Sequence, residues 1–234
     1  MATQTRWVLI YVWAVVTAGA LLLAGAALHW ESADPSAFLV CAGLAAWAST
    51  RKVALPGLTA TITPGFVFLL LAAGKLSWAE TVVIGVICGL VQCLWRPRKR
   101  PGLLQICFNV GTLSLSAGLA HGVSHGLAIT GLDPGSAPLL GVAGVVLLVA
   151  NTLLVSTVLC LVEDSPLRSV WRSLQFWSFA YYLAGGVVAG IWTQVPLTAG
   201  GGIVVFVALS VYLLDVCYSQ WIAGMGSAGK ALSS

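Results

Sequence analysis

Residues 7–28 read WVLIYVWAVVTAGALLLAGAAL, an apolar run without a single charged side chain. An α-helix needs about 20 such residues to cross the hydrocarbon core of a bilayer. The run follows Arg6 and could be mistaken for a signal peptide, but the apolar core of a signal peptide is only about 7 to 15 residues long. We therefore expect this stretch to be a retained transmembrane helix.

The rest of the chain has the same character. Of its 234 residues, 59% are hydrophobic and only 8% are charged, whereas soluble domains carry about 25% charged residues. This composition leaves no room for a sizeable soluble domain and predicts a multi-pass protein of the cell membrane. The net charge of +4 comes from short loops between apolar runs, so we expect no nucleic-acid partner.

Eight apolar segments predict an all-α, polytopic transmembrane helix bundle with about eight spans. The segments are 7–28, 37–50, 62–76, 79–95, 103–127, 138–162, 174–194 and 201–221. The first and the last four are long enough to cross a bilayer as single helices, but the second and third are short. Six spans with a re-entrant region at 37–76 is therefore the alternative. Residues 1–222 would form one domain, and 223–234 a short cytoplasmic tail rich in small residues.

The loop charges predict an orientation. With a cytoplasmic N-terminus and eight crossings, every basic residue except Lys75 lies on the cytoplasmic side. Cytoplasmic loops are enriched in Lys and Arg. We therefore expect both termini in the cytoplasm; a count of six spans would give the same sides. The acidic residues of the outer loops are Glu31, Asp34, Glu80 and Asp133.

The fifth segment carries a polar stripe made of Gln105, Asn109, Thr112 and Ser116. These residues recur at helical spacing and share one face of an α-helix. Such a stripe must face protein or water within a membrane. It predicts either a ligand-binding cavity with Asn109 as a contact, or hydrogen bonds between helices. Gln92 and Asn151 are candidate partners for such bonds, and Asn151 is also a candidate ligand contact.

Residues 59–65, TATITPG, interrupt the helical pattern. The threonines alternate as in an extended segment, and Pro64 followed by Gly65 resists helical continuation. Non-helical backbone at membrane depth is tolerated where it is buried or lines a wet cavity, as at transporter sites. One interpretation is therefore a binding loop with Thr61 and Thr63 as ligand contacts. The other is an ordinary cytoplasmic loop.

Asp215 lies well inside the last apolar segment. An uncompensated carboxylate is costly at that depth, so an intramembrane charge is a functional candidate. The residue predicts either a charge that takes part in signalling or a structural ion pair with Arg51 or Arg172.

His121 and His125 lie one helical turn apart near the outer surface. A metal site would need a third ligand, and only Asp133 is near in sequence, so we interpret the pair as polar residues at a helix end. The six cysteines lie in apolar segments without a C-x-x-C pair and are interpreted as small buried residues. The sequence contains no enzyme signature. We expect no catalytic residue, no metal and no cofactor.

A cluster of basic residues follows the fourth segment. Its members are Arg96, Arg98, Lys99 and Arg100. We interpret the cluster mainly as a determinant of topology that also contacts anionic lipid headgroups, at about 1 kcal/mol per basic residue.

Residues 55–110 resemble a known type of bacterial membrane input module. The resemblance rests on Leu55-Pro56-Gly57, 61–71, Glu80-Thr81, 91–95, Arg100-Pro101 and Phe108-Asn109-Val110. These stretches are similar to the multi-helix sensor regions, of MASE type, that precede GGDEF or HD-GYP domains in cyclic-di-GMP signalling proteins. Those regions feed a soluble output domain. The resemblance therefore implies a separate partner for this chain, or that the chain is a fragment of a longer signalling protein.

A second, looser resemblance is to the substrate-binding S components of energy-coupling-factor transporters, which also have a compact helix bundle and a Thr/Pro/Gly loop before an apolar segment, as at 61–71. Those proteins usually have six spans. The sequence thus leads to two functional hypotheses. The first is a non-enzymatic membrane sensor that binds a small or amphiphilic ligand in the bundle. The alternative is a transport subunit. Both predict membrane lipids and a membrane or cytoplasmic protein as partners.

Overall fold

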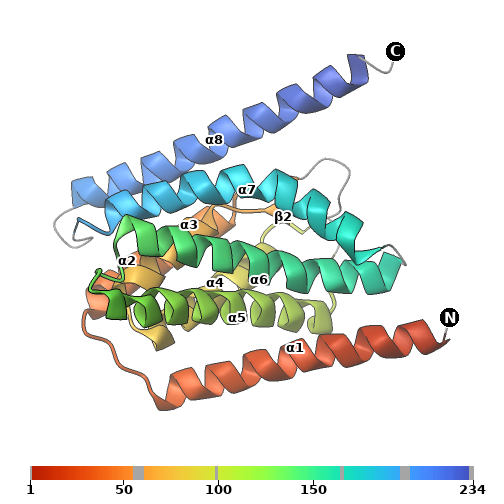
Figure 1. The fold of residues 1–234 in the computed structure, drawn as a ribbon, viewed down its shortest axis with the longest axis horizontal. Coiled ribbons are helices and arrows are strands. Elements are labelled where there is room, and N and C mark those ends of the chain that lie inside the picture. Colours follow the sequence, from red (N-terminus) through yellow and green to blue (C-terminus); the bar gives the residue numbers. More distant parts are fainter. Residues whose placement is uncertain (1, 55–60, 98–99, 164–165, 196–200, 232–234) are drawn as a thin grey trace.

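A computed structural model describes residues 2–54, 61–97, 100–163, 166–195 and 201–231 (Figure 1). Within these ranges the chain is almost entirely helical, so the all-α prediction is confirmed. The helices are α1 (Ala2–Leu28), α2 (Pro35–Ser49), α3 (Gly65–Lys75), α4 (Trp78–Leu94), α5 (Leu103–Leu127), α6 (Ala137–Glu163), α7 (Leu167–Trp192) and α8 (Gly201–Ala231). A short 3-10 turn, η1 (Ala128–Thr130), follows α5.

Each predicted apolar segment coincides with one helix. The bounds of α5 are those of the segment 103–127. Three helices are clearly longer than expected: α1 begins at Ala2 rather than at residue 7, α7 begins at Leu167 rather than at residue 174, and α8 continues to Ala231 into the predicted tail. Apolar runs mark the part of a helix that lies in lipid, whereas a helix can continue into water beyond that run.

The helices fall into two groups, those long enough to cross a membrane and those that are shorter. Within the described residues, four stretches are long and apolar enough to cross a membrane: Arg6–Leu28, Leu103–Thr130, Ala137–Glu163 and Val204–Ile222. The α7 helix is bent by 44° and becomes the fifth if its two halves count as one span. The expectation is met for the first, fifth, sixth and eighth segments, and for the seventh if the two halves of α7 form one span. The helices α2, α3 and α4 have 15, 11 and 17 residues, too few for a straight crossing of a core about 30 Å thick.

The short helix α3 lies at the centre of the molecule. Every residue from Gly65 to Ala73 is buried, and α3 packs against α2, α4, α5, α6 and α7. A helix that is apolar on all sides is stable only when other helices surround it. Figure 1 shows α1 and α8 as the outermost helices, on opposite sides of this centre.

A two-stranded antiparallel ladder leads into α3. It consists of β1 (Val53–Ala54) and β2 (Thr61–Ile62), with Val53 opposite Ile62 and Ala54 opposite Thr61. The extended backbone predicted at Thr61 is therefore present. Residues 55–60, which include part of the predicted loop, lie outside the described ranges.

Glycines permit a close contact between α4 and α5. A Cβ atom placed on Gly89 of α4 would lie 2.9 Å from Cα of Val110 on α5, and one on Gly85 would lie 3.0 Å from Cα of Ser114. Only a residue without a side chain permits backbones to approach this closely. The Gly85-x-x-x-Gly89 motif therefore fixes the packing of α4 on α5.

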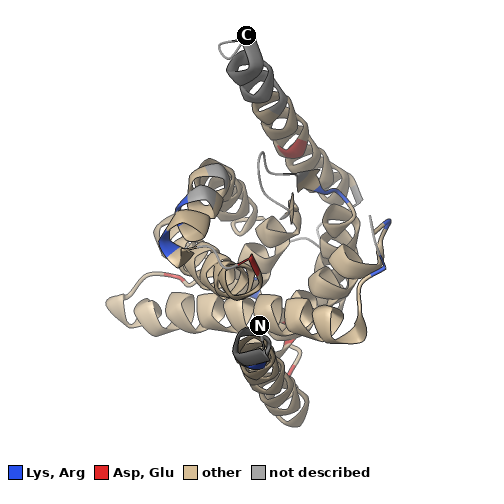
Figure 2. Ribbon diagram, turned by 90° about the vertical axis from the view of Figure 1, so that its right-hand side faces the viewer, with Lys and Arg blue, Asp and Glu red and all other residues tan. Residues whose placement is uncertain are grey.

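The two ends of the bundle differ in charge. We call the end that holds the start of α1, the end of α4 and the start of α7 the basic end; Figure 2 views the molecule from this side. At the opposite end, Glu80 accepts a hydrogen bond from Ser32 (2.5 Å). The Gly135 carbonyl at this end accepts one from Thr193 (2.5 Å). The first residues of α1 and the last residues of α8 lie at the same end (Figure 1).

Candidate functional site

A buried ion pair joins α8 to the connection between α2 and β1. Arg51 Nε lies 2.9 Å from Oδ2 of Asp215, and the Asp215 residue is only 5% exposed. Arg51 also places Cζ 4.5 Å from the ring centroid of Tyr212. Of the two partners predicted for Asp215, the structure therefore selects Arg51. A paired carboxylate is far less costly in an apolar bundle than a free one.

Asp215 has a second partner on α7. The hydroxyl of Tyr181 donates to Oδ1 of Asp215 at 3.3 Å. Tyr181 is fully buried, and Tyr218 of α8 stacks on its ring with the centroids 4.3 Å apart. The sequence offered no signal for this role of Tyr181, because tyrosine is common in membrane helices.

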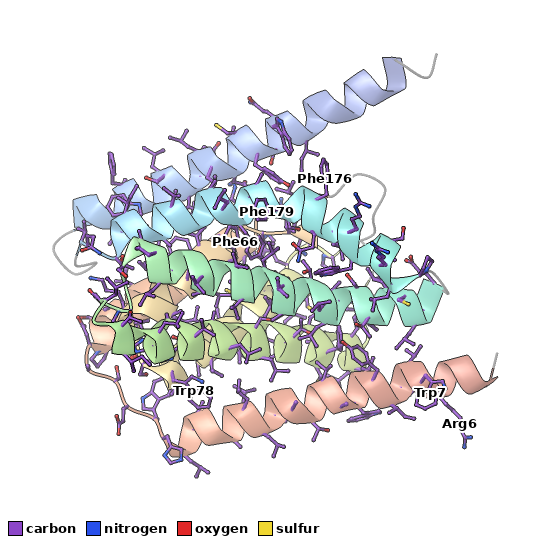
Figure 3. The ribbon with its side chains drawn as sticks, viewed as in Figure 1. Arg6, Trp7, Phe66, Trp78, Phe176 and Phe179 are labelled. Atoms are coloured by element: carbon purple, nitrogen blue, oxygen red, sulfur yellow. The ribbon has the colours of Figure 1, made fainter. Side chains whose placement is uncertain are left out.

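An aromatic cluster continues from Tyr181 into the central helix. Phe66 of α3 lies edge-on to Tyr181, with the ring centroids 5.2 Å apart, and stacks on Tyr182 at 4.0 Å. Asn151 of α6 lies near the Tyr182 side chain. The rings connect α3, α7 and α8. Figure 3 labels Phe66 of α3 and Phe179 of α7.

Tyr182 forms part of an apolar groove between α6 and α7. The groove has a volume of about 620 Å³, within the range of small-molecule sites. Its outer walls include Phe179 and Val187, which are more than half exposed, whereas Tyr182 is buried. Glycines create the space, because a Cβ atom on Gly141 or Gly186 would meet nothing within 4 Å. The groove is lined by Ala137, Gly141, Gly144, Val145, Leu148, Phe179, Tyr182, Leu183, Gly186, Val187, Gly190, Ile191 and Gln194.

The predicted polar stripe of α5 does not line this groove. Gln105 is exposed, while Thr112 and Ser116 are buried. Ser116 donates to the Thr112 carbonyl within α5 at 2.8 Å, and Asn109 donates to Sγ of Cys93 on α4 at 3.1 Å. The stripe thus takes part in packing within and between helices. Its role in ligand binding remains a prediction.

The threonines before α3 lie in different surroundings. Thr61 is exposed on β2, whereas Thr63 is buried and accepts a hydrogen bond from Gln92 of α4 at 2.8 Å. Gln92 therefore pairs with the segment before α3 rather than with the α5 stripe. The bond ties the start of the central helix to α4.

The two histidines hold the end of α3. Nε2 of His121 lies 3.2 Å from the Leu76 carbonyl, and Nε2 of His125 lies 3.1 Å from the Ala73 carbonyl. Their rings are stacked with the centroids 4.0 Å apart. Helix C-termini leave carbonyl groups without partners, and these imidazoles satisfy two of them. Within the described ranges, no group of three or more His, Cys, Asp or Glu residues is placed to hold a metal.

The burial predicted for the cysteines is confirmed in part, and the roles of the basic cluster remain predictions. Cys41, Cys88 and Cys93 are buried as expected, but Cys217 is exposed on α8. Cys107 and Cys160 are half-buried. Arg100 is exposed, and Arg98 and Lys99 lie outside the described residues.

Sequence reasoning missed the groove. The open space beside Gly186 depends on how α6 and α7 are placed relative to each other, which the sequence does not specify. Comparisons of the chain with family models, curated proteins and solved structures returned no match. The fold and its apolar helices define a helical membrane protein, and its function has to be inferred from its own geometry.

Proposed function

We propose that the chain is a non-enzymatic membrane sensor, in which an amphiphilic molecule from the bilayer occupies the α6–α7 groove and alters the packing of α8. One observation carries this proposal: contacts run without interruption from the groove to the buried ion pair. Tyr182 lies in the groove, Phe66 touches both Tyr182 and Tyr181, and Tyr181 donates to Asp215.

The groove suits an acyl chain. Its walls are almost wholly apolar, and it opens outward between two membrane-spanning helices. The Tyr182 hydroxyl and the Gln194 amide are the polar groups available to a headgroup or a hydroxyl. Sites of this kind fix ligand orientation with a few polar groups in an apolar lining.

The route to α8 has a physical basis. A ligand shifts a conformational equilibrium only when it binds one state better than the other. A chain seated against Tyr182 would favour one arrangement of the stacked Tyr182 and Phe66 rings, and Phe66 also contacts Tyr181. A displaced Tyr181 would weaken its 3.3 Å hydrogen bond to Asp215. The packing of α8 depends on that residue.

The cellular setting is part of the same proposal. We place both termini in the cytoplasm of a bacterial cell, with eight membrane crossings in which α2 and α3 cross a locally thinned bilayer. A cytoplasmic or membrane protein would read the position of α8. The resemblance to MASE-type sensor regions favours this arrangement.

The proposal is tested by measuring whether α8 moves when a ligand binds. A spin label on the exposed Cys217 is paired with a second on Leu103→Cys at the start of α5, after Cys107 and Cys160 are changed to serine. The probe is cis-parinaric acid, a fluorescent fatty acid, added to the full chain in phosphatidylcholine nanodiscs. We expect saturable binding and a shift in the label-to-label distance measured by pulsed electron paramagnetic resonance.

Three variants make the test specific. Gly186→Leu fills the groove and should weaken binding at least tenfold, whereas Gly122→Leu, also in open space, should bind like wild type. Tyr181→Phe should bind the probe but lose the distance shift. Unchanged binding by Gly186→Leu would remove the groove from the proposal. Binding without any movement of α8 would contradict the sensor role.

A transport subunit is the second candidate, favoured by the central helix. A short helix that is buried on all sides and follows a Pro-Gly break is a feature of transporter binding sites. In this case α3 and the bonded pair Thr63–Gln92 would lie at the substrate site. Solute flux into liposomes that is abolished by Gln92→Leu would support transport.

A further inference from the structure

The end of α4 carries a strained basic residue. Arg96 has a φ angle of +42°, the left-handed region, at the position after the C-cap residue Trp95. Glycine is the usual residue there, and a side chain at positive φ costs about 1 to 2 kcal/mol. The strain places the Arg96 guanidinium carbon 5.8 Å from the ring centroid of Trp95.

A second cation approaches from a distant part of the chain. Nζ of Lys52, in the connection between α2 and β1, donates to the Trp95 carbonyl at 2.6 Å. This bond holds the ammonium at the carbonyl that immediately precedes Arg96 in the chain, and it uses one of the three ammonium donors. Partial burial lowers the pKa of Lys52 from its ordinary value. An anion beside the ammonium would offset that cost.

Neither cation has a carboxylate partner within the described ranges. The salt bridge found there is that between Arg51 and Asp215. Two cations held at the same helix end without a carboxylate leave positive charge that an anion would neutralise, as in a binding site that lacks its anion.

The neighbouring side chains place the two cations at a membrane surface. Trp95 is 49% exposed, and Leu94 and Leu90 extend the exposed apolar surface along α4. Tryptophan concentrates at the level of lipid headgroups, and exposed leucines next to it face acyl chains. The apolar surface distinguishes a lipid from a free phosphate, because only a lipid would cover Leu90 and Leu94.

We propose that Lys52 and Arg96 bind the phosphate of one anionic phospholipid, whose acyl chain lies along Leu94 and Leu90. Arginine can donate two parallel hydrogen bonds to a phosphate, and lysine supplies a point charge. We call this the Lys52–Arg96 site. It does not share residues with the α6–α7 groove, so an experiment can refute either proposal without refuting the other.

The test compares lipids and variants in nanodiscs. The full chain is placed in phosphatidylcholine with or without phosphatidylglycerol, and lipid retention is measured by native mass spectrometry together with thermal unfolding. We expect wild type to retain phosphatidylglycerol preferentially and to melt at a higher temperature when it is present. Lys52→Gln should reduce the preference about fivefold, as expected for one basic residue near a lipid surface.

Arg96→Gly separates binding from structure. Glycine relieves the strain at positive φ, so this variant should be at least as stable as wild type in pure phosphatidylcholine. It should nevertheless lose the gain from phosphatidylglycerol. Arg172→Gln, an exposed arginine at the same end of the bundle, is the matched control and should keep the preference.

Two results would overturn the site. Retention of the phosphatidylglycerol effect by both Lys52→Gln and Arg96→Gly would show that these residues do not bind the lipid. Stabilisation of wild type by inorganic phosphate or glycerol phosphate in pure phosphatidylcholine, lost in Arg96→Gly, would assign the site to a soluble phosphate instead.

Discussion

Asp215 shows how one buried charge can hold a peripheral helix. Removing one member of a fully buried ion pair costs about 3 to 5 kcal/mol. The Arg51 side chain is 34% exposed and can reach water when its partner is lost. We therefore expect Asp215→Asn to destabilise the protein by about 1 to 3 kcal/mol.

The chain contains its own reporter for this measurement. Cys41 and Cys88 are buried and become reactive toward a thiol-specific dye only when the bundle opens, once Cys107, Cys160 and Cys217 have been changed to serine. The double variant Arg51→Met with Asp215→Leu should recover part of the stability, because an apolar pair needs no compensating charge. A double variant less stable than Asp215→Asn would contradict the ion-pair explanation.

Asp34 provides a pH-dependent test outside the membrane. Its carboxylate caps α2 by accepting hydrogen bonds from Ser36 Oγ at 2.5 Å and from the backbone N–H of Ala37 at 3.0 Å. These bonds lower the pKa of Asp34 below its usual value of 3.8. The pKa of Asp34 is therefore lower in the folded protein than in the unfolded chain. Above the pKa of the unfolded chain the carboxylate cap stabilises α2 fully, and this stabilisation is lost as the pH falls through the pKa of the folded protein.

Hydrogen exchange at the start of α2 measures this effect. After correction for intrinsic rates, protection of the Ala37 amide should decrease as the pH is lowered below about 4. Asparagine is an effective N-cap that does not titrate, so Asp34→Asn should keep its protection at low pH. Equal pH profiles for the two proteins would exclude a role of the carboxylate.

The contact between α4 and α5 shows what a single methyl group does to a helix pair. The Cβ of Gly89→Ala would lie 2.9 Å from the Val110 backbone, so the two helices must separate. We expect a loss of about 1 to 3 kcal/mol, the usual cost of overpacking. Gly122→Ala on α5 meets nothing within 4 Å and should be neutral or stabilising by up to about 1 kcal/mol. The thiol assay described above compares both variants.

At the level of helices, sequence patterns predicted what depends on local chemistry. The apolar run at 103–127 predicted the bounds of α5. The third segment was predicted to begin at residue 62, but α3 begins three residues later, after Pro64. The ends of α7 and α8 were missed because a helix can continue outside lipid. The relay from Tyr182 through Phe66 to Tyr181 was not predictable, because it depends on how α3 packs against α7. The sequence predicted Arg51 or Arg172 as the partner of Asp215, because both carry a positive charge. The structure shows that the partner is Arg51.

The arrangement of the whole bundle bears on the number of membrane crossings. The helices α2 and α3 are short, which taken alone favours a re-entrant pair. However, Lys52 donates to the Trp95 carbonyl at the end of α4, so the connection after α2 reaches the same level as the end of α4. We therefore expect the chain to cross the membrane at α2 and again at α3.

Native lysines test this arrangement without any substitution. Lys75, at the end of α3, is exposed, and Lys52 is partly exposed near the basic end. A membrane-impermeant amine reagent should modify Lys75 and not Lys52 in right-side-out vesicles, and the reverse in inside-out vesicles, as read by mass spectrometry of the peptides. Modification of both from one side would contradict two crossings between them. A re-entrant pair that stops short of the far surface would leave Lys52 unmodified from either side, because its ammonium would then lie within the apolar core rather than among lipid headgroups.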